Sequence, residues 1–277
     1  QKADGIIGFG SEKHRKNSPN PPNIIETEIY EKRIKEPVFS LCFAHNGGAL
    51  TLGGWNSSLH LNGDDPKRFN TIYTHSLWKY DWGSQYRIKV KSIDVDGDKI
   101  SYDYEALNHG RKYGEGAFLD SGTTFIYVAA DFYALLKQKF GNYCSGDRKR
   151  CGGMNNNLDC YAYDPAQYEN DLQAFMKTFP VINFDVGAER LYKLHPEDYM
   201  VRLDESGDMR AATNPDYCVG INTLKNMSLG GVFWRNYDIQ INKEKMTVGF
   251  VRADCGKSGK VTPHNQPPVE NTETTET

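Results

Sequence analysis

The ten residues AFLDSGTTFI, numbered 117–126, decide how the rest of this sequence is interpreted. Apolar residues on both sides of a polar tetrad indicate two strands joined by a tight turn, with Asp120 at the tip. The Gly122 N–H and the hydroxyls of Ser121 and Thr123 are placed to hydrogen-bond the carboxylate. Two interpretations remain open on these residues alone, an oriented reactive carboxylate and an Asx turn between strands.

The composition around this segment favours a β-rich globular protein. Aromatic residues make up 12% of the 277 residues, and there are 26 glycines, which suit strands and tight turns respectively. The 33 Lys and Arg against 36 Asp and Glu give a net charge of -3. This balance offers no bulk attraction to nucleic acid or to an anionic membrane surface. No apolar run approaches the roughly 18 residues that a membrane-spanning helix needs.

The hydrophobic pattern predicts an all-β fold with a few short helices. A helix is expected after Asn23, with an apolar stripe of Ile24, Ile25, Ile29 and Ile34, ending before Pro37. Further helices are expected over 131–140 and 165–177. Strands are expected over 38–43, 49–52, 86–95, 99–104, 117–119, 125–128 and 180–186, with a final hairpin over 237–251. Residues 256–277 contain three prolines and no aromatic residue, which predicts a disordered tail.

Acidic residues near position 96 could suggest a calcium loop. Asp94, Asp96, Asp98 and Glu105 occupy its first, third, fifth and twelfth positions, but Lys99 stands where the loop needs glycine. A hairpin turn at Asp96-Gly97 therefore accounts better for this stretch.

The cysteines indicate an oxidising compartment. Their even number, without zinc-site spacing, favours disulfides over a metal site, although six buried free thiols are the alternative. Six cysteines can pair in fifteen ways, and these residues alone do not choose among them. Asn56 and Asn226 begin N-x-[ST] sequons, which agree weakly with secretion. The cysteines are Cys42, Cys144, Cys151, Cys160, Cys218 and Cys255.

An ordered set of motifs extends over nearly all of residues 3–255. The motifs are DGIIGFG (4–10), FSLC (39–42), LTLGG (50–54), FLDSGTT (118–124), FPVINFDVGAERLYKLHPEDYMV (179–201), SLGGVF (228–233) and YDIQINKEKMTVGFVRADC (237–255). The set resembles the pepsin-like aspartic peptidases, which include pepsin, nepenthesin-type and membrane-anchored enzymes.

The resemblance implies a bilobal acid-protease fold with an incomplete N-terminal lobe. Residues 1–60 would be the remainder of that lobe and the interlobe strands, and 61–255 the C-terminal catalytic lobe. Asp120-Ser121-Gly122-Thr123 matches the second catalytic loop, with Thr124 following it. The first loop would lie N-terminal to residue 1. Asp81-Trp82-Gly83-Ser84 is a near match, but Trp82 has no hydroxyl, so an ordinary loop is expected there.

The same resemblance implies supports for the catalytic loops and three disulfides. Ile6-Ile7-Gly8 resembles the supporting segment of the first lobe, and Ser228-Leu229-Gly230 resembles that of the second. The implied pairs are Cys160 with Cys218, Cys144 with Cys151, and Cys42 with Cys255.

The expected function is aspartic endopeptidase activity in the secretory or endolysosomal lumen, or outside the cell. The substrate would be a polypeptide, neither a cofactor nor a metal is expected, and the missing N-terminal lobe would be required for activity. The alternative is a non-catalytic homologue that binds or inhibits other proteins on a pepsin-like scaffold.

Overall fold

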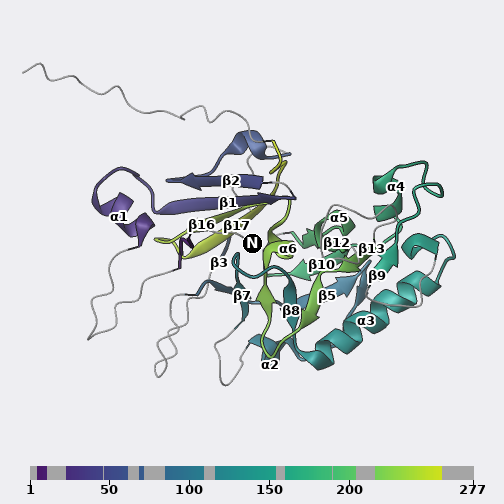
Figure 1. The fold of residues 1–277 in the computed structure, drawn as a ribbon. Helices are drawn as coiled ribbons and strands as arrows, with labels where there is room; N and C mark the ends of the chain where they lie inside the picture. The colour runs from purple at the N-terminus through teal and green to yellow at the C-terminus, as the bar shows by residue number, and fades with distance from the viewer. Residues whose placement is uncertain are drawn as a thin grey trace, which may run out of the picture.

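A central antiparallel sheet joins the N-terminal and C-terminal parts of the described chain. The computed structural model describes residues 5–10, 23–45, 47–61, 69–71, 85–108, 116–153, 160–188, 190–203 and 216–257. Figure 1 shows β1 and β2 beside the C-terminal strands β16 and β17. The sheet order is β2-β1-β16-β17-β3. The bounds are β1 Val38–Ala44, β2 Gly47–Leu52, β3 Phe69–Thr71, β16 Tyr237–Asn242 and β17 Thr247–Arg252.

The helix before this sheet is shorter than its apolar stripe predicted. Helix α1 covers Ile24–Tyr30 and begins at a capping box, in which Asn23 accepts from the Glu26 N–H and Glu26 accepts from the Asn23 N–H. The helix ends at Glu31, and Lys32 has a φ of 58°, which is left-handed backbone. The last residue of the stripe, Ile34, therefore lies outside the helix, which ends before the left-handed Lys32 and well before Pro37. A short 3-10 helix, η1, follows β2 at Ser57–Leu59.

Three further sheets build the C-terminal body. Their orders are β14-β8-β15-β7-β4, β11-β10-β5-β6 and β12-β13-β9. The first sheet is mixed, because β14 lies parallel to β8 and β15 lies parallel to β7. The bounds are β4 Arg87–Ile88, β5 Ser92–Val95, β6 Asp98–Lys99, β7 Ala117–Leu119, β8 Ile126–Val128, β9 Cys160–Ala162, β10 Ile182–Asp185, β11 Tyr192–Leu194, β12 Met200–Leu203, β13 Asp216–Val219, β14 Ile221–Thr223 and β15 Ser228–Leu229.

Helices among the described residues pack against the strands of these sheets. The longest, α3 (Ala130–Ser145), buries Phe132, Leu136 and Phe140 at successive helical turns. The ring of Phe140 contacts the rings of Tyr161 and Tyr199, so the helix closes an aromatic core. The others are α2 Tyr104–Asn108, η3 Cys151–Gly153, α4 Leu172–Met176, α5 Pro196–Tyr199 and α6 Gly231–Trp234. The described residues contain no helix with both the length and the apolar character to cross a bilayer.

Three further predicted elements were wrong in extent. The helix expected over 165–177 forms only at α4, because Glu169 and Asn170 have φ values of 51° and 61°, which interrupt a helix. The strand expected over 99–104 stops at Lys99, because Asp103 caps α2 by accepting from the Ala106 N–H at 2.9 Å. The strand expected over 86–95 is split into β4 and β5.

The hairpin turn at Asp96-Gly97 is confirmed. Both residues have positive φ, 51° and 87°, as a two-residue hairpin turn requires. Asp94 Oδ1 accepts from the Gly97 N–H and from Asn183 Nδ2, each at 2.7 Å. The Asp94 carboxylate therefore stabilises the hairpin turn. Among the described residues no group of three or more His, Cys, Asp or Glu could hold a metal ion.

Candidate functional site

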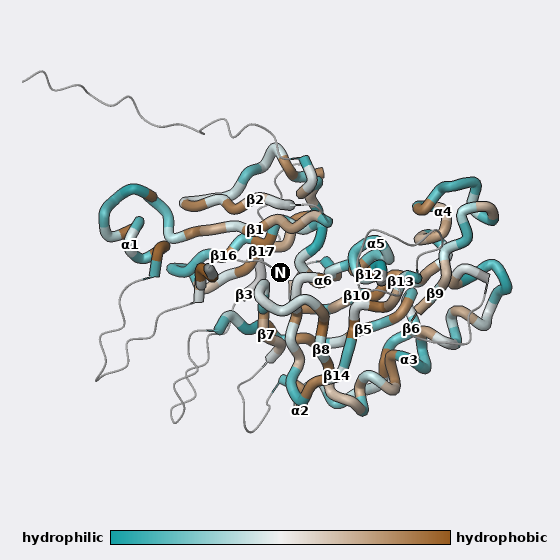
Figure 2. Tube along the Cα trace, viewed as in Figure 1, coloured by the Kyte–Doolittle hydropathy of each residue, from teal (hydrophilic) through white to brown (hydrophobic). Residues whose placement is uncertain are grey.

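Asp120 follows β7 directly, and a third strand runs between the two strands that carry its loop. Strand β15 pairs in parallel with β7 and antiparallel with β8. The Asp120 N–H donates to the Leu229 carbonyl oxygen at 3.1 Å, so the backbone of Asp120 is part of this pairing. Figure 2 shows that the flanking strands β7 and β8 are apolar. The loop tip is therefore polar while both of its ends are anchored in the core.

The Asp120 carboxylate is oriented by its own loop. The Gly122 N–H donates to Oδ1 at 3.1 Å, and the Thr123 hydroxyl donates to Oδ2 through a short hydrogen bond. The Thr123 N–H also donates to the Asp120 backbone oxygen at 3.2 Å. Asp120 is half-buried and Gly122 is exposed. Two donors on two different oxygens hold the carboxylate in one orientation.

Glycine at position 230 lets β15 pass close to the Asp120 loop. A Cβ at this position would lie 2.6 Å from the Thr123 carbonyl oxygen and closer still to that of Phe125. The next two residues bind the loop, because the Gly231 N–H donates to Thr123 O at 2.6 Å and the Val232 N–H to Thr124 O at 3.0 Å. Gly230, as well as Leu229, thus lies against the loop where the resemblance implied support.

The other implied support is not brought to this loop. Ile6 is 97% exposed and Ile7 is 67% exposed, and a Cβ on Gly8 would meet no atom within 4 Å. The segment is held through Phe9, whose ring stacks on Phe39 and whose carbonyl accepts from the Tyr86 hydroxyl at 2.8 Å. A supporting role for Ile7 and Gly8 stays a prediction. Asp81 and its near-match loop lie outside the described residues, as does the predicted tail beyond Lys257.

A depression of about 400 Å³ lies beside the Asp120 loop. Ser121 to Thr124 line one side, and Phe43, Ala44, Gly47, Gly231 and Arg235 complete it. Ser121 is exposed there. The sequence analysis did not single out Arg235, because an arginine after an apolar run carries no local signal of a site.

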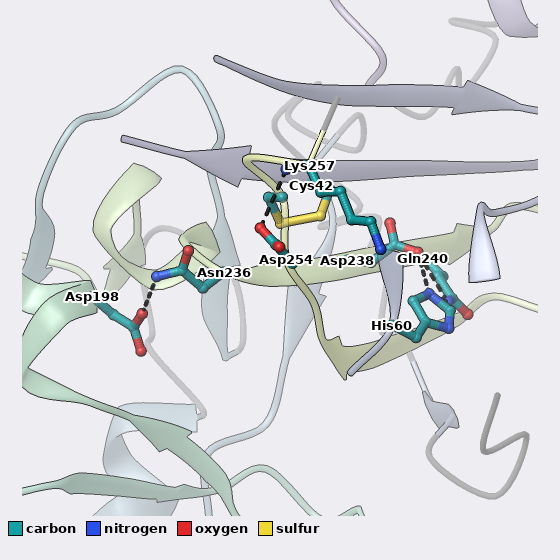
Figure 3. Close-up of a disulfide and its surroundings, with 9 residues drawn as sticks. Cys42, His60, Asp198, Asn236, Asp238, Gln240, Asp254 and Lys257 are labelled. Atoms are coloured by element: carbon teal, nitrogen blue, oxygen red, sulfur yellow. Dashed lines mark hydrogen bonds and ion pairs between the residues drawn. A yellow bond between two sulfur atoms is a disulfide. The ribbon is translucent and has the colours of Figure 1, made fainter. Parts of the chain in front are cut away.

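A buried acidic residue that the sequence analysis also missed ties α5 to the central sheet. Asp198 is fully buried, and its carboxylate accepts from Arg252 Nη1 at 2.6 Å, from Asn236 Nδ2 at 2.7 Å and from the His195 N–H at 2.9 Å. Figure 3 shows the bond to Asn236. Burial raises the pKa of Asp198, while Arg252 and Asn236 act in the opposite direction. With three donors on its carboxylate, Asp198 is a structural group.

A second buried polar cluster lies in the central sheet near a disulfide (Figure 3). His60 Nε2 lies 2.8 Å from Asp238 Oδ2, and the two side chains are 0% and 1% exposed. Gln240 Nε2 donates to the same carboxylate oxygen at 3.2 Å.

The structure contains disulfides between Cys42 and Cys255, Cys144 and Cys151, and Cys160 and Cys218, which are the pairs that the resemblance implied.

The two sequons have different surroundings. Asn56 is the N-cap of η1, and its Oδ1 accepts from the Ser58 N–H at 3.1 Å and from the Ser58 hydroxyl at 2.7 Å. Asn226 is half-buried, and Ser228 of its sequon lies buried in β15. Glycosylation stays a prediction at both sites.

Comparison with known proteins finds one matching family model and several curated relatives. The family model described as "Xylanase inhibitor C-terminal" matches residues 85–252. "Aspartyl protease family protein 1" from Arabidopsis thaliana is 22% identical over 254 residues, covering 91% of this chain and 40% of the relative. "Plasmepsin VII" from Plasmodium berghei is 22% identical over 272 residues, covering 91% of the chain and 50% of the relative. "Aspartic proteinase 36" from Arabidopsis thaliana is 23% identical over 267 residues, covering 93% and 46%.

The chain thus spans at most half the length of these curated relatives. The matched range covers all of the Asp120 loop, the strand β15 between β7 and β8, and two of the five strands of the central sheet, β16 and β17. The chain belongs to the xylanase-inhibitor C-terminal family, whose members carry the C-terminal domain of the pepsin-like aspartic proteases.

Proposed function

We propose that this chain supplies one of the two catalytic carboxylates of an aspartic endopeptidase, and that this carboxylate is Asp120. The observation that supports the proposal is the pair of donors on Asp120, the Gly122 N–H and the Thr123 hydroxyl. A turn that merely connects two strands does not require a third strand between them. Here β15 provides that additional support for the loop.

The chemistry requires a second carboxylate, which we propose comes from a separate lobe of the same precursor, either uncleaved or retained after processing. When two carboxylates share one proton, the ionised one removes a proton from the attacking water. The protonated one then donates to the departing amide nitrogen, so no covalent intermediate with the enzyme forms. A single carboxylate cannot perform both tasks at once. The isolated chain is therefore expected to be inactive.

Peptide cleavage at acidic pH tests the proposal. The samples are this chain alone, the chain joined to its upstream polypeptide, and the joined protein carrying Asp120→Asn. Asp164→Asn is a matched control, because Asp164 is exposed and its Oδ1 only accepts from the Ala166 N–H. Activity in the joined protein and the control, but not in Asp120→Asn, supports the assignment. Unchanged cleavage after Asp120→Asn contradicts it, and cleavage by the isolated chain points instead to a dimer of two Asp120 loops.

The alternative function is a non-catalytic homologue that binds or inhibits another protein. The description of the matching family, "Xylanase inhibitor C-terminal", favours it. On this interpretation the joined protein with Asp120 intact would cleave no peptide and would lower the activity of a xylanase added to it. The same preparations therefore distinguish the two functions when both assays are run.

The proposed setting is the secretory pathway or the outside of the cell. Three disulfides among the described residues are typical of proteins that fold in an oxidising compartment. Glycans on Asn56 or Asn226 would shift the mass of the purified protein, and removal by an N-glycosidase would reverse that shift. We also propose that residues 1–60 form the remainder of the N-terminal lobe and the interlobe strands, that 61–255 form the C-terminal lobe, and that 256–277 form a tail.

A further inference from the structure

A cavity of about 510 Å³ lies apart from the Asp120 loop. Its described lining residues come from β11, β16 and β17, from the segment between β10 and β11, and from the residue after β11. None of them lines the depression beside the Asp120 loop. Small-molecule sites in proteins commonly have volumes of about 300–1,000 Å³. This cavity, called the β11 cavity below, therefore has the size of a ligand site and no part in the proposed cleavage.

Aromatic rings of the β11 cavity are held in fixed positions by one another. Tyr192 is buried between the rings of Phe233 and Tyr237, whose centroids lie 4.1 Å and 4.2 Å from its own. Phe250 contacts Tyr192 edge-on at a centroid distance of 5.3 Å. The Tyr237 hydroxyl donates to the Lys193 carbonyl oxygen at 2.7 Å, which joins β16 to β11. An apolar group entering the cavity would therefore meet an ordered aromatic surface and would lose little free energy to ordering it.

Aliphatic residues before β11 extend this apolar lining towards the solvent. Val186, Ala188 and Leu191 all line the cavity. Val186 is 2% exposed, whereas Leu191 is 46% exposed. A bound apolar group would remove part of the Leu191 side chain from water, which favours binding by about 25 cal/mol for each Å² that is covered.

The β11 cavity is positively charged, and none of its described lining residues is acidic. Arg190 and Lys193 line it, are exposed, and form no ion pair with a described residue. Arg252 lines it too, but this guanidinium is balanced by Asp198 at 2.6 Å and Glu197 at 2.9 Å. Arg190 and Lys193 therefore supply charge that would attract an anion to the apolar lining.

We propose that the β11 cavity binds a small organic anion with an apolar body, of the class of medium-chain carboxylates. The apolar body lies on Tyr237, Phe250 and Leu191, and the carboxylate lies at Arg190 and Lys193. The proposal does not require that Asp120 be catalytic, because the two sites share no described lining residue.

The C-terminal segment of this chain is a competing occupant that the sequence disfavours. Residues 258–277 follow β17 and carry Glu270, Glu273 and Glu276, so they could supply the negative charge. They contain no aromatic residue and no leucine, isoleucine or methionine, so they have no large side chain to place on the aromatic lining. A free carboxylate with an apolar chain satisfies both halves of the cavity.

Titration calorimetry with sodium decanoate, on this chain and on the joined protein, tests the proposal. Lys193→Glu should weaken binding by about 5-fold or more because it reverses a charge at the site, and Leu191→Ser should weaken it because apolar contact is lost. Lys149→Glu is the matched control, since Lys149 is exposed and does not line the cavity. Acetate lacks the apolar body and decyltrimethylammonium lacks the negative charge, so each should bind about 10-fold or more weakly than decanoate.

One-site binding of decanoate by both proteins, weakened in the two cavity variants and unchanged in Lys149→Glu, supports the proposal. Equal weakening in Lys149→Glu, or no binding up to about 5 mM decanoate, overturns it. Three further results also overturn it by identifying another occupant. Tighter binding by a chain that ends at Lys257 identifies the C-terminal segment, and binding by this chain but not by the joined protein identifies the upstream lobe. Tighter binding of an acidic peptide that contains phenylalanine identifies a peptide site.

Discussion

The backbone of Gly230 lies against the backbone of Thr123, with room for a hydrogen atom but not for a methyl group. A Cβ on Gly230 would lie 2.6 Å from the Thr123 carbonyl oxygen. Because that oxygen also accepts from the Gly231 N–H, it cannot move away without losing a hydrogen bond. The shape of the Asp120 loop therefore depends on the absence of a side chain more than a hundred residues later in the sequence.

We expect Gly230→Ala to destabilise this chain by about 2 kcal/mol or more, since the clash is with backbone atoms that cannot rotate aside. Urea unfolding followed by tryptophan fluorescence measures the change. Gly54→Ala is the matched control, because a Cβ there meets nothing within 4 Å. Equal midpoints for the two variants would show that the loop can relax around the added carbon.

Thr123→Val should lower cleavage by the joined enzyme by about 10-fold or more, since it removes a hydrogen bond to a charged group while keeping the side-chain shape. Thr123→Ser keeps the hydroxyl and should restore much of the rate. The measurement is kcat on a peptide substrate at acidic pH. A rate for Thr123→Val equal to that of the unmodified enzyme would contradict the orienting role of this hydroxyl.

His60→Ala should cost about 3 kcal/mol or more, because it leaves the buried Asp238 carboxylate without its partner at 2.8 Å. Chemical denaturation at neutral pH measures this loss. His45→Ala serves as the comparison, since His45 is exposed, and it should stay within about 0.5 kcal/mol. If His60→Ala lowers the free energy of unfolding as little as His45→Ala does, the hydrogen bond from Gln240 alone is sufficient to stabilise the buried Asp238 carboxylate.

The stability of this chain should fall as the pH rises above 10. Burial raises the pKa of Tyr237 from 10.0 to about 12, and its hydroxyl donates to the Lys193 carbonyl oxygen at 2.7 Å. The unfolded phenol therefore ionises first, so this stabilising contribution is complete below pH 10 and is lost as the pH approaches 12. The full shift corresponds to roughly 3 kcal/mol.

Urea unfolding at a series of pH values between 8 and about 11 measures the slope of this loss. Tyr237→Phe should make the slope shallower. Tyr30→Phe should leave it unchanged, because Tyr30 is 87% exposed. A steeper slope in Tyr237→Phe would contradict the expectation that the Tyr237 hydroxyl contributes to the loss of stability at high pH.

Replacing both cysteines of the 42–255 disulfide should cost more stability than replacing those of the 144–151 disulfide. The two bonds span 213 and 7 residues. The loop-closure entropy of the unfolded chain makes the expected difference about 3 kcal/mol. Unfolding of the two double-alanine variants side by side measures it. A larger loss for the short loop would indicate that the native packing around Cys151, which is 1% exposed, dominates.

The parts of the fold that were predictable from the sequence are those with a local signal. Asp120 stands between two apolar runs, and the final hairpin alternates regularly, so both could be placed from neighbouring residues alone. The insertion of β15 between β7 and β8 has no local signal, because it pairs Ser228 with Phe118 across the sequence. The resemblance to a family, rather than periodicity, indicated that support.

The errors also have physical causes. The helix expected over 165–177 contains residues with suitable propensity, but Glu169 and Asn170 adopt left-handed backbone that composition does not reveal. Arg235 was not recognised as a candidate because only the three-dimensional structure brings it to the depression that Ser121 to Thr124 line. Asp198 was missed because its role depends on donors from Arg252 and Asn236, which only the three-dimensional structure brings to its carboxylate.

The disulfide between Cys42 and Cys255 turns most of this polypeptide into a covalent ring. Any single cut of the backbone between these two cysteines leaves both fragments attached to each other. A sample nicked in one of its loops would therefore migrate as one species on a non-reducing gel and separate only after reduction. Purity judged without a reducing agent would miss such damage, and a maturation cut in this region would not release either fragment.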